Sequence, residues 1–377
     1  MPIRVAVPHE TTPGERRVAL IPGVAEQLTK LGLQVQIQTG AGCAAFYRDQ
    51  DYTTAEIVED RATLLGEADI VLTVSPLTVD DVALLREGTT VIGFLHPHEY
   101  EDHICALRDR KITGFAMELL PRISREQNMD ALSSQASIAG YKAALMAANR
   151  TARFFPMLTT AAGTIRPAKV LVIGVGVAGL QAIATAKRLG AMVEAYDVRP
   201  ETREQVESLG AKFVDVQVKA VGEGGYAREL SEQEKQQEME VLARHVIEAD
   251  AIISTAGVPG KPAPKIITSA MVDDMKPGAV IIDLAAYSGG NCELTIPGES
   301  FGHDLVMIYG PLNVPAMMPV NASEMYAKNL FNFMSLIVRD GEINPDWEDE
   351  IVAASVLTRN GVIEHGLTCE RVEGGSS

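Results

Sequence analysis

The chain has 377 residues, 46 % hydrophobic and 22 % charged, which is the balance of a folded globular protein. Its formal net charge of −17 disfavours nucleic acid and anionic membrane surfaces as partners, because no basic cluster is present to neutralise phosphates. The sequence has no apolar run of the ~18 residues that a membrane-spanning helix needs. The N-terminus lacks the apolar core of a signal peptide, and the four cysteines are scattered. We expect a soluble, cytoplasmic protein of two domains.

Strand and helix patterns alternate through the first third of the chain. Short apolar runs predict strands at residues 3–7, 35–38, 70–74, 91–94 and 112–116. Helical spacing predicts helices at residues 22–31, 79–86 and 102–109. Such alternation predicts a parallel sheet covered on both faces. This region has no G-x-G-x-x-G turn, so its sheet need not bind a dinucleotide.

The rest of the chain repeats the same rhythm. A long helix at 130–152 leads through a Pro/Thr/Gly linker at 155–167 into strands at 170–173, 192–196, 212–216, 251–255, 280–283 and 305–309. A charged, glycine-bearing stretch at 218–237 predicts a mobile loop that runs into a helix ending at 248. A further helix is predicted at 323–338 and a hairpin at 355–364. We expect an α/β protein of two doubly wound, Rossmann-like domains with parallel sheets. The predicted domains are residues 1–135 plus 325–377, and residues 136–324.

The segment from Lys169 to Arg199 has the pattern of a dinucleotide-binding unit. Gly174, Gly176 and Gly179 follow an apolar strand and open a helix. The first glycine permits the tight turn, the second lets the backbone approach a pyrophosphate, and the third lets helix and strand pack closely. Asp197 ends the next strand, where a carboxylate accepts ribose hydroxyls and repels a 2′-phosphate. The pattern predicts NAD(H), although Arg199 nearby could accommodate the phosphate of NADP(H).

A second polar cluster occupies the stretch PRISREQNMDALSSQ, just before and into the long helix. Asp130 could simply begin that helix, since an acid is favoured at a helix N-terminus. Alternatively, Asp130 and Ser133 share one helix face and could act together with Gln127 and Arg122 on a ligand. Gln127 offers both a donor and an acceptor to a carboxamide. The residue types alone leave both interpretations open.

These two motifs together resemble those of the NAD(H)-binding component of proton-translocating nicotinamide nucleotide transhydrogenase. Further stretches resemble that family in the same order, namely RVALIP, TTAAGTIRPAKVLVIG, GGYA, VPGKPAPKIIT and IIDLAAYSGGNCELT. The resemblance covers residues 1 to 370. It is similar to the separately encoded soluble alpha subunit, because no membrane helices follow.

The resemblance implies roles for individual residues. It implies that Arg122, Gln127, Asp130 and Ser133 hold the nicotinamide. Cofactor contacts are implied for Gly174, Gly176, Val177, Ala178, Gly179, Asp197, Val198, Arg199, Gly225, Tyr226 and Gly257. Gly225 and Tyr226 would lie on the mobile loop that closes over the nucleotide. Some members place a glutamine against the adenosine where this chain has Glu238, with Gln237 adjacent.

Alanine dehydrogenases share the architecture and provide a rival interpretation, an amino acid dehydrogenase complete in one chain. Arg17 and His96 resemble two of that family's substrate residues. The lysine expected before Ser75 is Thr73, and the acid expected in the DLAxxxGG stretch is Tyr287. Thr73 is too short and uncharged to hold a carboxylate, and a phenol with a pKa of about 10 cannot replace one. A third possibility is an NAD-binding regulatory protein without turnover.

Transfer of a hydride between two nicotinamides needs binding, alignment and exclusion of water, with no acid–base pair. We therefore expect NADH to bind in a cleft between the two domains and to pass its hydride to NADP⁺ held by a partner subunit. Proton translocation would occur in separate membrane subunits, to which this chain would bind peripherally. The resemblance also implies a homodimer. We expect no metal site, since His96 and His98 read as loop residues.

Overall fold

The computed structural model describes residues 2–215, 232–257, 260–339 and 341–374. The chain forms two compact units, Met1–Gln135 with Pro315–Ser377, and Ala136–Val314. The predicted ranges placed residues 315–324 in the second domain, whereas these residues pack with the first unit. None of the helices in the described part of the chain is long and apolar enough to cross a membrane.

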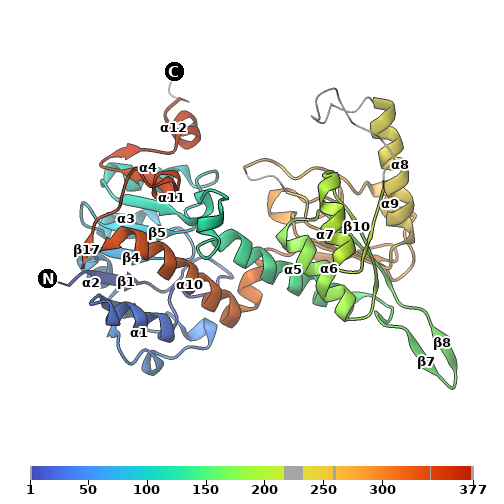
Figure 1. Cartoon of the computed structure of the whole chain (residues 1–377), viewed down its shortest axis with the longest axis horizontal. Coiled ribbons are helices and arrows are strands. Elements are labelled where there is room, and N and C mark those ends of the chain that lie inside the picture. The colour runs from blue at the N-terminus through green and yellow to red at the C-terminus, as the bar shows by residue number, and fades with distance from the viewer. Residues whose placement is uncertain (1, 216–231, 258–259, 340, 375–377) are drawn as a thin grey trace. The chain divides into compact units, whose positions relative to one another are not determined.

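The first unit is built on an eight-stranded sheet of order β19-β18-β6-β5-β4-β1-β2-β3 (Figure 1). Its strands are β1 (Arg4–Val7), β2 (Gln34–Gln38), β3 (Glu56–Val58), β4 (Ile70–Leu72), β5 (Thr90–Gly93), β6 (Thr113–Ala116), β18 (Val356–Arg359) and β19 (Val362–Ile363). All neighbouring pairs from β3 to β6 are parallel, whereas β18 pairs antiparallel with β6 and β19. The predicted parallel sheet is confirmed, and the predicted C-terminal hairpin forms its antiparallel edge.

Helices cover both faces of this sheet. They are α1 (Pro22–Lys30), α2 (Arg61–Glu67), α3 (Val79–Leu84), α4 (Glu101–Asp109), α10 (Pro319–Ile337), α11 (Glu350–Ser355) and α12 (Gly366–Glu373). Ile70 and Leu72 pack into the core formed with α1 and α10, whereas Val71 between them packs into the core formed with α2, α3 and α4. A strand whose successive side chains are buried on opposite faces is typical of a parallel sheet, and it explains the continuous apolar run in β4. A two-stranded pair, β16 (Val338–Arg339) and β17 (Glu342–Ile343), follows α10.

The second unit has a seven-stranded sheet of order β11-β10-β9-β12-β13-β15-β14. Its strands are β9 (Lys169–Ile173), β10 (Met192–Tyr196), β11 (Lys212–Phe213), β12 (Ala251–Ser254), β13 (Val280–Asp283), β14 (Ser300–His303) and β15 (Val306–Tyr309). Its helices are α5 (Ala131–Arg150), which starts in the first unit, α6 (Val177–Arg188), α7 (Arg203–Ser208), α8 (Glu232–Glu248) and α9 (Ser269–Asp273). Only β14 runs antiparallel to its neighbour among the described strands of this sheet.

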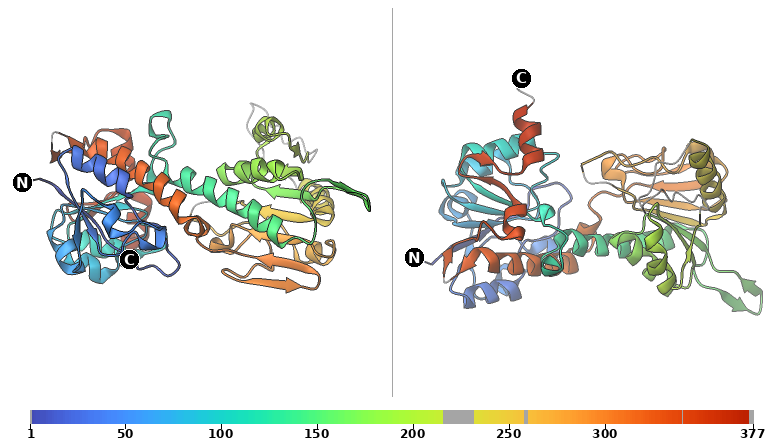
Figure 2. Two further views of the ribbon diagram at one scale, coloured as in Figure 1. Left: turned by 90° about the horizontal axis from the view of Figure 1, so that it is seen from below. Right: turned by 45° about the horizontal axis from the view of Figure 1, so that its top comes forward.

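The predicted linker at 155–167 is wrong in part, because a hairpin forms within it. Strands β7 (Leu158–Thr160) and β8 (Gly163–Ile165) pair antiparallel and extend away from the sheet of the second unit (Figures 1 and 2). Thr159 and Thr164 face each other across the pair, and Gly163 has a φ of +125° at the turn. β-Branched residues favour strands, and they outweigh the Pro/Gly content on which the linker prediction depended.

Helices α5 and α6 approach each other closely at Gly140. A Cβ at this position would overlap the carbonyl oxygen of Ala178, in the first turn of α6. The absence of a side chain at Gly140 therefore allows the backbone of α5 to pack directly against the start of α6.

Substituting Gly140→Ala should destabilise the second unit by about 1–3 kcal/mol, because one of the two helices must shift to admit the methyl group. Gly23→Ala is the matched control, since a Cβ at this helical position would meet no atom within 4 Å. Calorimetric unfolding measures both variants. Equal thermal midpoints for the two would contradict the packing described here.

Candidate functional site

The crevice of the second unit lies where its strand order reverses. From β9 the chain proceeds outward to β10 and β11, and then returns to place β12 on the other side of β9. In doubly wound sheets, ligands bind at the carboxyl ends of the strands at such a switch point. The glycine turn follows β9 at this position, and residues 255–257 follow β12 beside it.

The glycine turn has the geometry of a phosphate-binding turn. Gly174 has a φ of +90°, a conformation that favours glycine, and a Cβ at Gly179 would overlap the carbonyl oxygen of Gly174. Gly176 is exposed, and a Cβ there would meet no atom within 4 Å. Gly176 is also the N-cap of α6, so no side chain at this position can accept the first N–H groups of the helix. Those groups and the helix dipole would favour an anion such as the pyrophosphate of NAD(H).

Asp197 lies at the end of β10 and is already hydrogen-bonded. Its Oδ2 accepts the Val175 N–H at 2.6 Å, and its Oδ1 accepts both the backbone N–H and the Nε–H of Arg199 at 2.9 Å. Burial favours the protonated acid, but the Arg199 guanidinium and the Val175 N–H together hold the pKa of Asp197 below its usual value. Asp197 is therefore ionised at neutral pH and fixed against the glycine turn. Ribose hydroxyls would share this carboxylate with Arg199, whose side chain is half exposed.

The other predicted cofactor residues of the second unit differ in their surroundings. Val177 and Val198 are exposed apolar side chains beside the turn, and Ala178 is half-buried. Gly257 is exposed, and a Cβ there would lie 3.4 Å from the phenol oxygen of Tyr287. Gly225 and Tyr226 lie outside the described residues, as does the Glu238 side chain, whereas Gln237 is exposed on α8.

The cluster from Arg122 to Ser133 belongs to the first unit, apart from the crevice residues in the chain. Asp130 Oδ1 accepts the Ser133 N–H at 2.8 Å, as a helix cap does. The capping interpretation is thus part of its role, and the second carboxylate oxygen leaves room for a ligand contact as well. Arg122 and Gln127 are exposed, and Asp130 and Ser133 are half-buried.

This segment is held in place by side chains from elsewhere in the first unit. Asn329 and Asn332 on α10 donate to the carbonyl oxygen of Asn128 at 3.0 and 2.9 Å. Arg125 pairs with Asp349 at 2.6 Å. These long-range contacts fix the backbone around Gln127, a prerequisite for any role in orienting a ring.

Glu126 is a member of this cluster that the sequence analysis overlooked. Its side chain is buried, and its Oε2 has no hydrogen-bond partner among the described residues. Burial, and then the nearby Asp130, raise the pKa of Glu126 above its usual value. No sequence signal could distinguish it from the surface glutamates, because its burial comes from tertiary packing.

The first unit has the same strand reversal, between β1 and β4, but a carboxylate fills it. Glu10 follows β1 and accepts the N–H groups of Val74 and Ser75, after β4, at 2.6 and 3.1 Å. These two N–H groups lie at the switch point, where a bound nucleotide's acceptors would be expected in such a sheet. The structure thus gives a reason, beyond the missing glycine turn, why this sheet would not take a dinucleotide.

Residues that resemble the substrate site of alanine dehydrogenases surround Glu10. The Arg17 guanidinium donates to both carboxylate oxygens of Glu15, at 2.8 and 2.7 Å, and to Gln135 Oε1 at 2.9 Å. Thr73 is buried, and its Oγ1 has no partner among the described residues. An internal carboxylate therefore occupies the cation that a substrate carboxylate would need.

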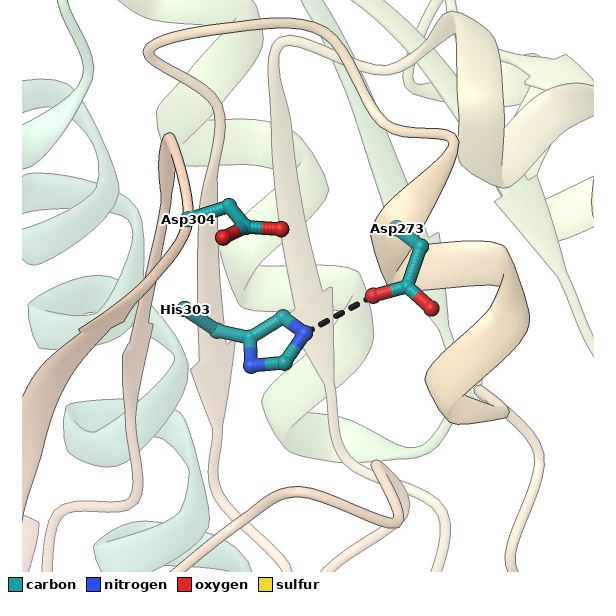
Figure 3. A group of neighbouring side chains, drawn as sticks. All are labelled: Asp273, His303 and Asp304. Atoms are coloured by element: carbon teal, nitrogen blue, oxygen red, sulfur yellow. Dashed lines mark hydrogen bonds and ion pairs between the residues drawn. The ribbon is translucent and has the colours of Figure 1, made fainter.

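One group of described side chains has the spacing of metal ligands, namely Asp273, His303 and Asp304 in the second unit (Figure 3). His303 Nε2 lies 2.7 Å from Asp273 Oδ1, so the imidazole already has a partner. Both carboxylates are exposed, and exposed acidic groups commonly lie together without an ion. The hydrogen bond accounts for the arrangement, and we assign no metal to it.

The doubly wound sheet with its glycine turn and the acid that follows β10 define a Rossmann-type dinucleotide-binding protein. The chain belongs to the alanine dehydrogenase/PNT family, whose N-terminal domain matches residues 6–139 and whose C-terminal domain matches residues 143–366. The first part of NAD(P) transhydrogenase subunit alpha of Rhodospirillum rubrum is 47 % identical over 376 residues, covering 96 % of this chain and 98 % of the relative.

Two other relatives place the chain within this family. The crystal structure of transhydrogenase from Sinorhizobium meliloti superposes with a TM-score of 0.85 at 40 % identity, covering 97 % of this chain and 99 % of that one. Alanine dehydrogenase of Mycolicibacterium smegmatis is 28 % identical over 367 residues, covering 95 % of this chain and 93 % of the relative. The transhydrogenase subunits are thus markedly more similar to this chain than that alanine dehydrogenase is.

The buried carboxyl of Glu118 should make the stability of the first unit depend on pH. Burial raises the pKa of Glu118 from 4.5 to about 7, so folding favours the protonated acid. Its contribution to stability is fully present below about pH 4.5 and is lost as the pH rises through about 7. Glu118→Gln cannot ionise, and relative to the wild type it should gain stability between pH 5 and 8, on the order of 1–3 kcal/mol.

Urea unfolding followed by Trp347 fluorescence measures this effect, because the single tryptophan stacks on Phe115 in the first unit. The burial-raised pKa of Glu10, also about 7, adds a term of the same sign to both proteins and cancels in the difference. A constant difference between variant and wild type across this pH range would show that Glu118 is not buried as described.

Proposed function

We propose that the chain is the NAD(H)-binding part of a proton-translocating NAD(P) transhydrogenase and that it passes a hydride from NADH to NADP⁺ held by a partner subunit. The carrying observation is the glycine turn with its uncapped α6 N-terminus and Asp197 fixed beside it, in a chain 47 % identical to a transhydrogenase alpha subunit over nearly its whole length. NADH supplies the hydride when it is bound. The chain itself must bind the nucleotide, align it and exclude water.

Each part of the site has a task in this proposal. The N–H groups at the start of α6 receive the pyrophosphate, and Asp197 receives the ribose hydroxyls. Gln127 offers a donor and an acceptor to the carboxamide, while Asp130, Ser133 and Arg122 fix the orientation of the nicotinamide ring. No step removes a proton from either nicotinamide C4, so the site needs no general base.

An alanine-dehydrogenase-like activity is the second candidate, and it is favoured by the shared family and by Arg17 and His96. Two observations count against it. Arg17 is engaged by Glu15 and Gln135, and the position of the expected lysine is the buried, uncharged Thr73. Tyr287 is exposed and stands where an acid would be required. A regulatory NAD-binding protein without turnover would bind NADH but would not transfer its hydride.

The partners follow from the names of the relatives, since a subunit designated alpha, and divided into parts, indicates further subunits in those organisms. We infer that this chain binds membrane-embedded and NADP(H)-binding subunits and lies at the cytoplasmic face of the membrane through them. We also propose a homodimer. The hairpin β7–β8 supports self-association, because all its residues are exposed and Met157, Leu158 and Ile165 present apolar surface. An isolated two-stranded hairpin is only marginally stable in water and gains stability from a covering partner.

The purified chain should bind NADH more tightly than NADPH, because the ionised Asp197 repels a 2′-phosphate. Equilibrium titration of nucleotide fluorescence measures both affinities. Tighter binding of NADPH would contradict the proposed function at its first step.

Asp130→Asn should slow hydride transfer at least about tenfold while changing NADH affinity by no more than about twofold. Asparagine still caps α5, so the fold is retained and only the charge beside the nicotinamide is lost. Gln127→Asn should behave similarly, because the amide is withdrawn by one methylene. Transfer is measured with an NADP⁺ analogue bound to an added NADP(H)-binding partner domain. Equal losses of affinity and rate would indicate that these residues only bind the nucleotide.

A further inference from the structure

The two sides of the crevice in the second unit are joined by a single side chain. Thr255, directly after β12, donates its hydroxyl to the carbonyl oxygen of Gly174 at 2.9 Å. Its backbone N–H donates to Ile173 at 2.7 Å, which extends the β9–β12 pairing to the edge of the sheet. Gly174 must lack a Cβ for this contact, since one would lie 2.7 Å from the Thr255 hydroxyl. The glycine turn and residues 255–257 are therefore held at a fixed separation.

Asn291 fixes the next residue along that edge. Its side chain is fully buried, and its Oδ1 accepts the Ala256 N–H at 3.0 Å. Its Nδ2 donates to the carbonyl oxygens of Ala256 and Pro264, at 2.7 and 3.0 Å. One amide thus satisfies both backbone groups of Ala256, which lies between Thr255 and Gly257. An aspartate or a leucine could not make the same set of bonds.

The loop that carries Asn291 is itself anchored to the sheet. Asp283, the last residue of β13, is fully buried and accepts the Cys292 N–H at 3.0 Å and the Thr295 hydroxyl at 2.7 Å. Gly290 has a φ of +84°, and a Cβ there would lie 2.7 Å from Asp283 Oδ2. The buried carboxylate therefore fixes the backbone on one side of Asn291, and the position of Ala256 is set from β13 as well as from β9.

We propose that Thr255 and Asn291 are positioning residues for NADH, because they fix residues 255–257 against the glycine turn and so set the width of the nucleotide crevice. The inference rests on the proposed function, since it concerns how the same site holds the nucleotide. A small displacement of one side would misplace the nicotinamide, and hydride transfer is sensitive to shifts of this size. Neither side chain needs to touch the nucleotide for this effect.

The pair Thr255→Val and Thr255→Ser tests the hydroxyl. Valine has nearly the shape of threonine but cannot donate to Gly174, whereas serine keeps the donor. Thr255→Val should weaken NADH binding about three- to tenfold. It should also lower the rate of hydride transfer at saturating NADH, and Thr255→Ser should restore both to within about twofold. Nucleotide fluorescence titration gives the affinity, and turnover with an NADP(H)-binding partner domain gives the rate.

Thr151→Val is the matched control. Thr151 makes the same kind of bond, from its hydroxyl to the carbonyl oxygen of Asp250 at 3.3 Å, but it does so before β12, at the opposite edge of the sheet. It should lower thermal stability without changing NADH affinity. If Thr255→Val and Thr151→Val affect affinity equally, or if Thr255→Ser fails to rescue, the hydroxyl is merely structural and the inference is overturned. A wild-type chain that does not bind NADH would instead overturn the proposed function.

Asn291→Asp provides an independent test that is read from a pH profile. At pH 8 the ionised aspartate would face the carbonyl oxygens of Ala256 and Pro264 without a proton to donate, so NADH affinity should fall about tenfold. Near pH 5.5 the protonated acid can donate to Ala256 again, and affinity relative to the wild type at the same pH should recover. The neighbouring Asp283, Cys292 and Lys265 are unchanged in both proteins. A loss that is the same at both pH values would contradict the positioning role of Asn291.

Discussion

The close approach of α6 to β9 is the constraint on which the rest of the nucleotide site depends. The helix begins only three residues after the positive-φ turn at Gly174, and Gly179 in its first turn lies against the Gly174 carbonyl without a Cβ between them. This packing directs the N–H groups at the start of α6 toward the crevice, where the dipole favours an anion. Gly140 extends the same principle to α5, which packs on Ala178. Three glycines thus determine where a pyrophosphate could bind.

The two units show how one topology can support different tasks. Each sheet reverses its strand order at one point, between β1 and β4 in the first unit and between β9 and β12 in the second. In the second unit, glycines leave the backbone N–H groups at this point accessible. In the first unit, Glu10 accepts the N–H groups of Val74 and Ser75, so a protein carboxylate takes the place of a ligand. Fold alone therefore does not distinguish the nucleotide-binding sheet, and the side chains at the switch point do.

The amino-acid sequence predicted most of the regular structure, since apolar runs and helical spacing are local signals. Both sheets, the long helix α5 and the glycine turn were evident in this way. The short elements β3 and α2 were not, because three exposed or half-buried residues in β3 give no clear alternation. The hairpin β7–β8 was taken for a linker, since its threonines were weighed less than the flanking Pro and Gly residues.

Other features of the candidate site depend on contacts that no local pattern reports. The partner of Arg17 is only two residues away at Glu15, but the burial of that pair depends on packing of the whole unit. Thr255 and Asn291 meet residues 81 and 35 positions away, and neither type carries a motif by itself. Asp197 was predicted as a ribose acceptor from its place after β10, yet its engagement by Arg199 and Val175 required the structure. Sequence patterns thus indicated where the nucleotide would bind, and tertiary contacts indicate how its site is held.

A reconstitution assay tests the central claim most directly. The purified chain would be mixed with the NADP(H)-binding domain of a transhydrogenase, and NADH oxidation would be followed together with reduction of a spectrally distinct NADP⁺ analogue. The same chain alone would be supplied with NAD⁺ and L-alanine. The account predicts stoichiometric hydride transfer in the mixture and no alanine-dependent NADH formation by the chain alone. Alanine-dependent reduction of NAD⁺ without transfer in the mixture would contradict it.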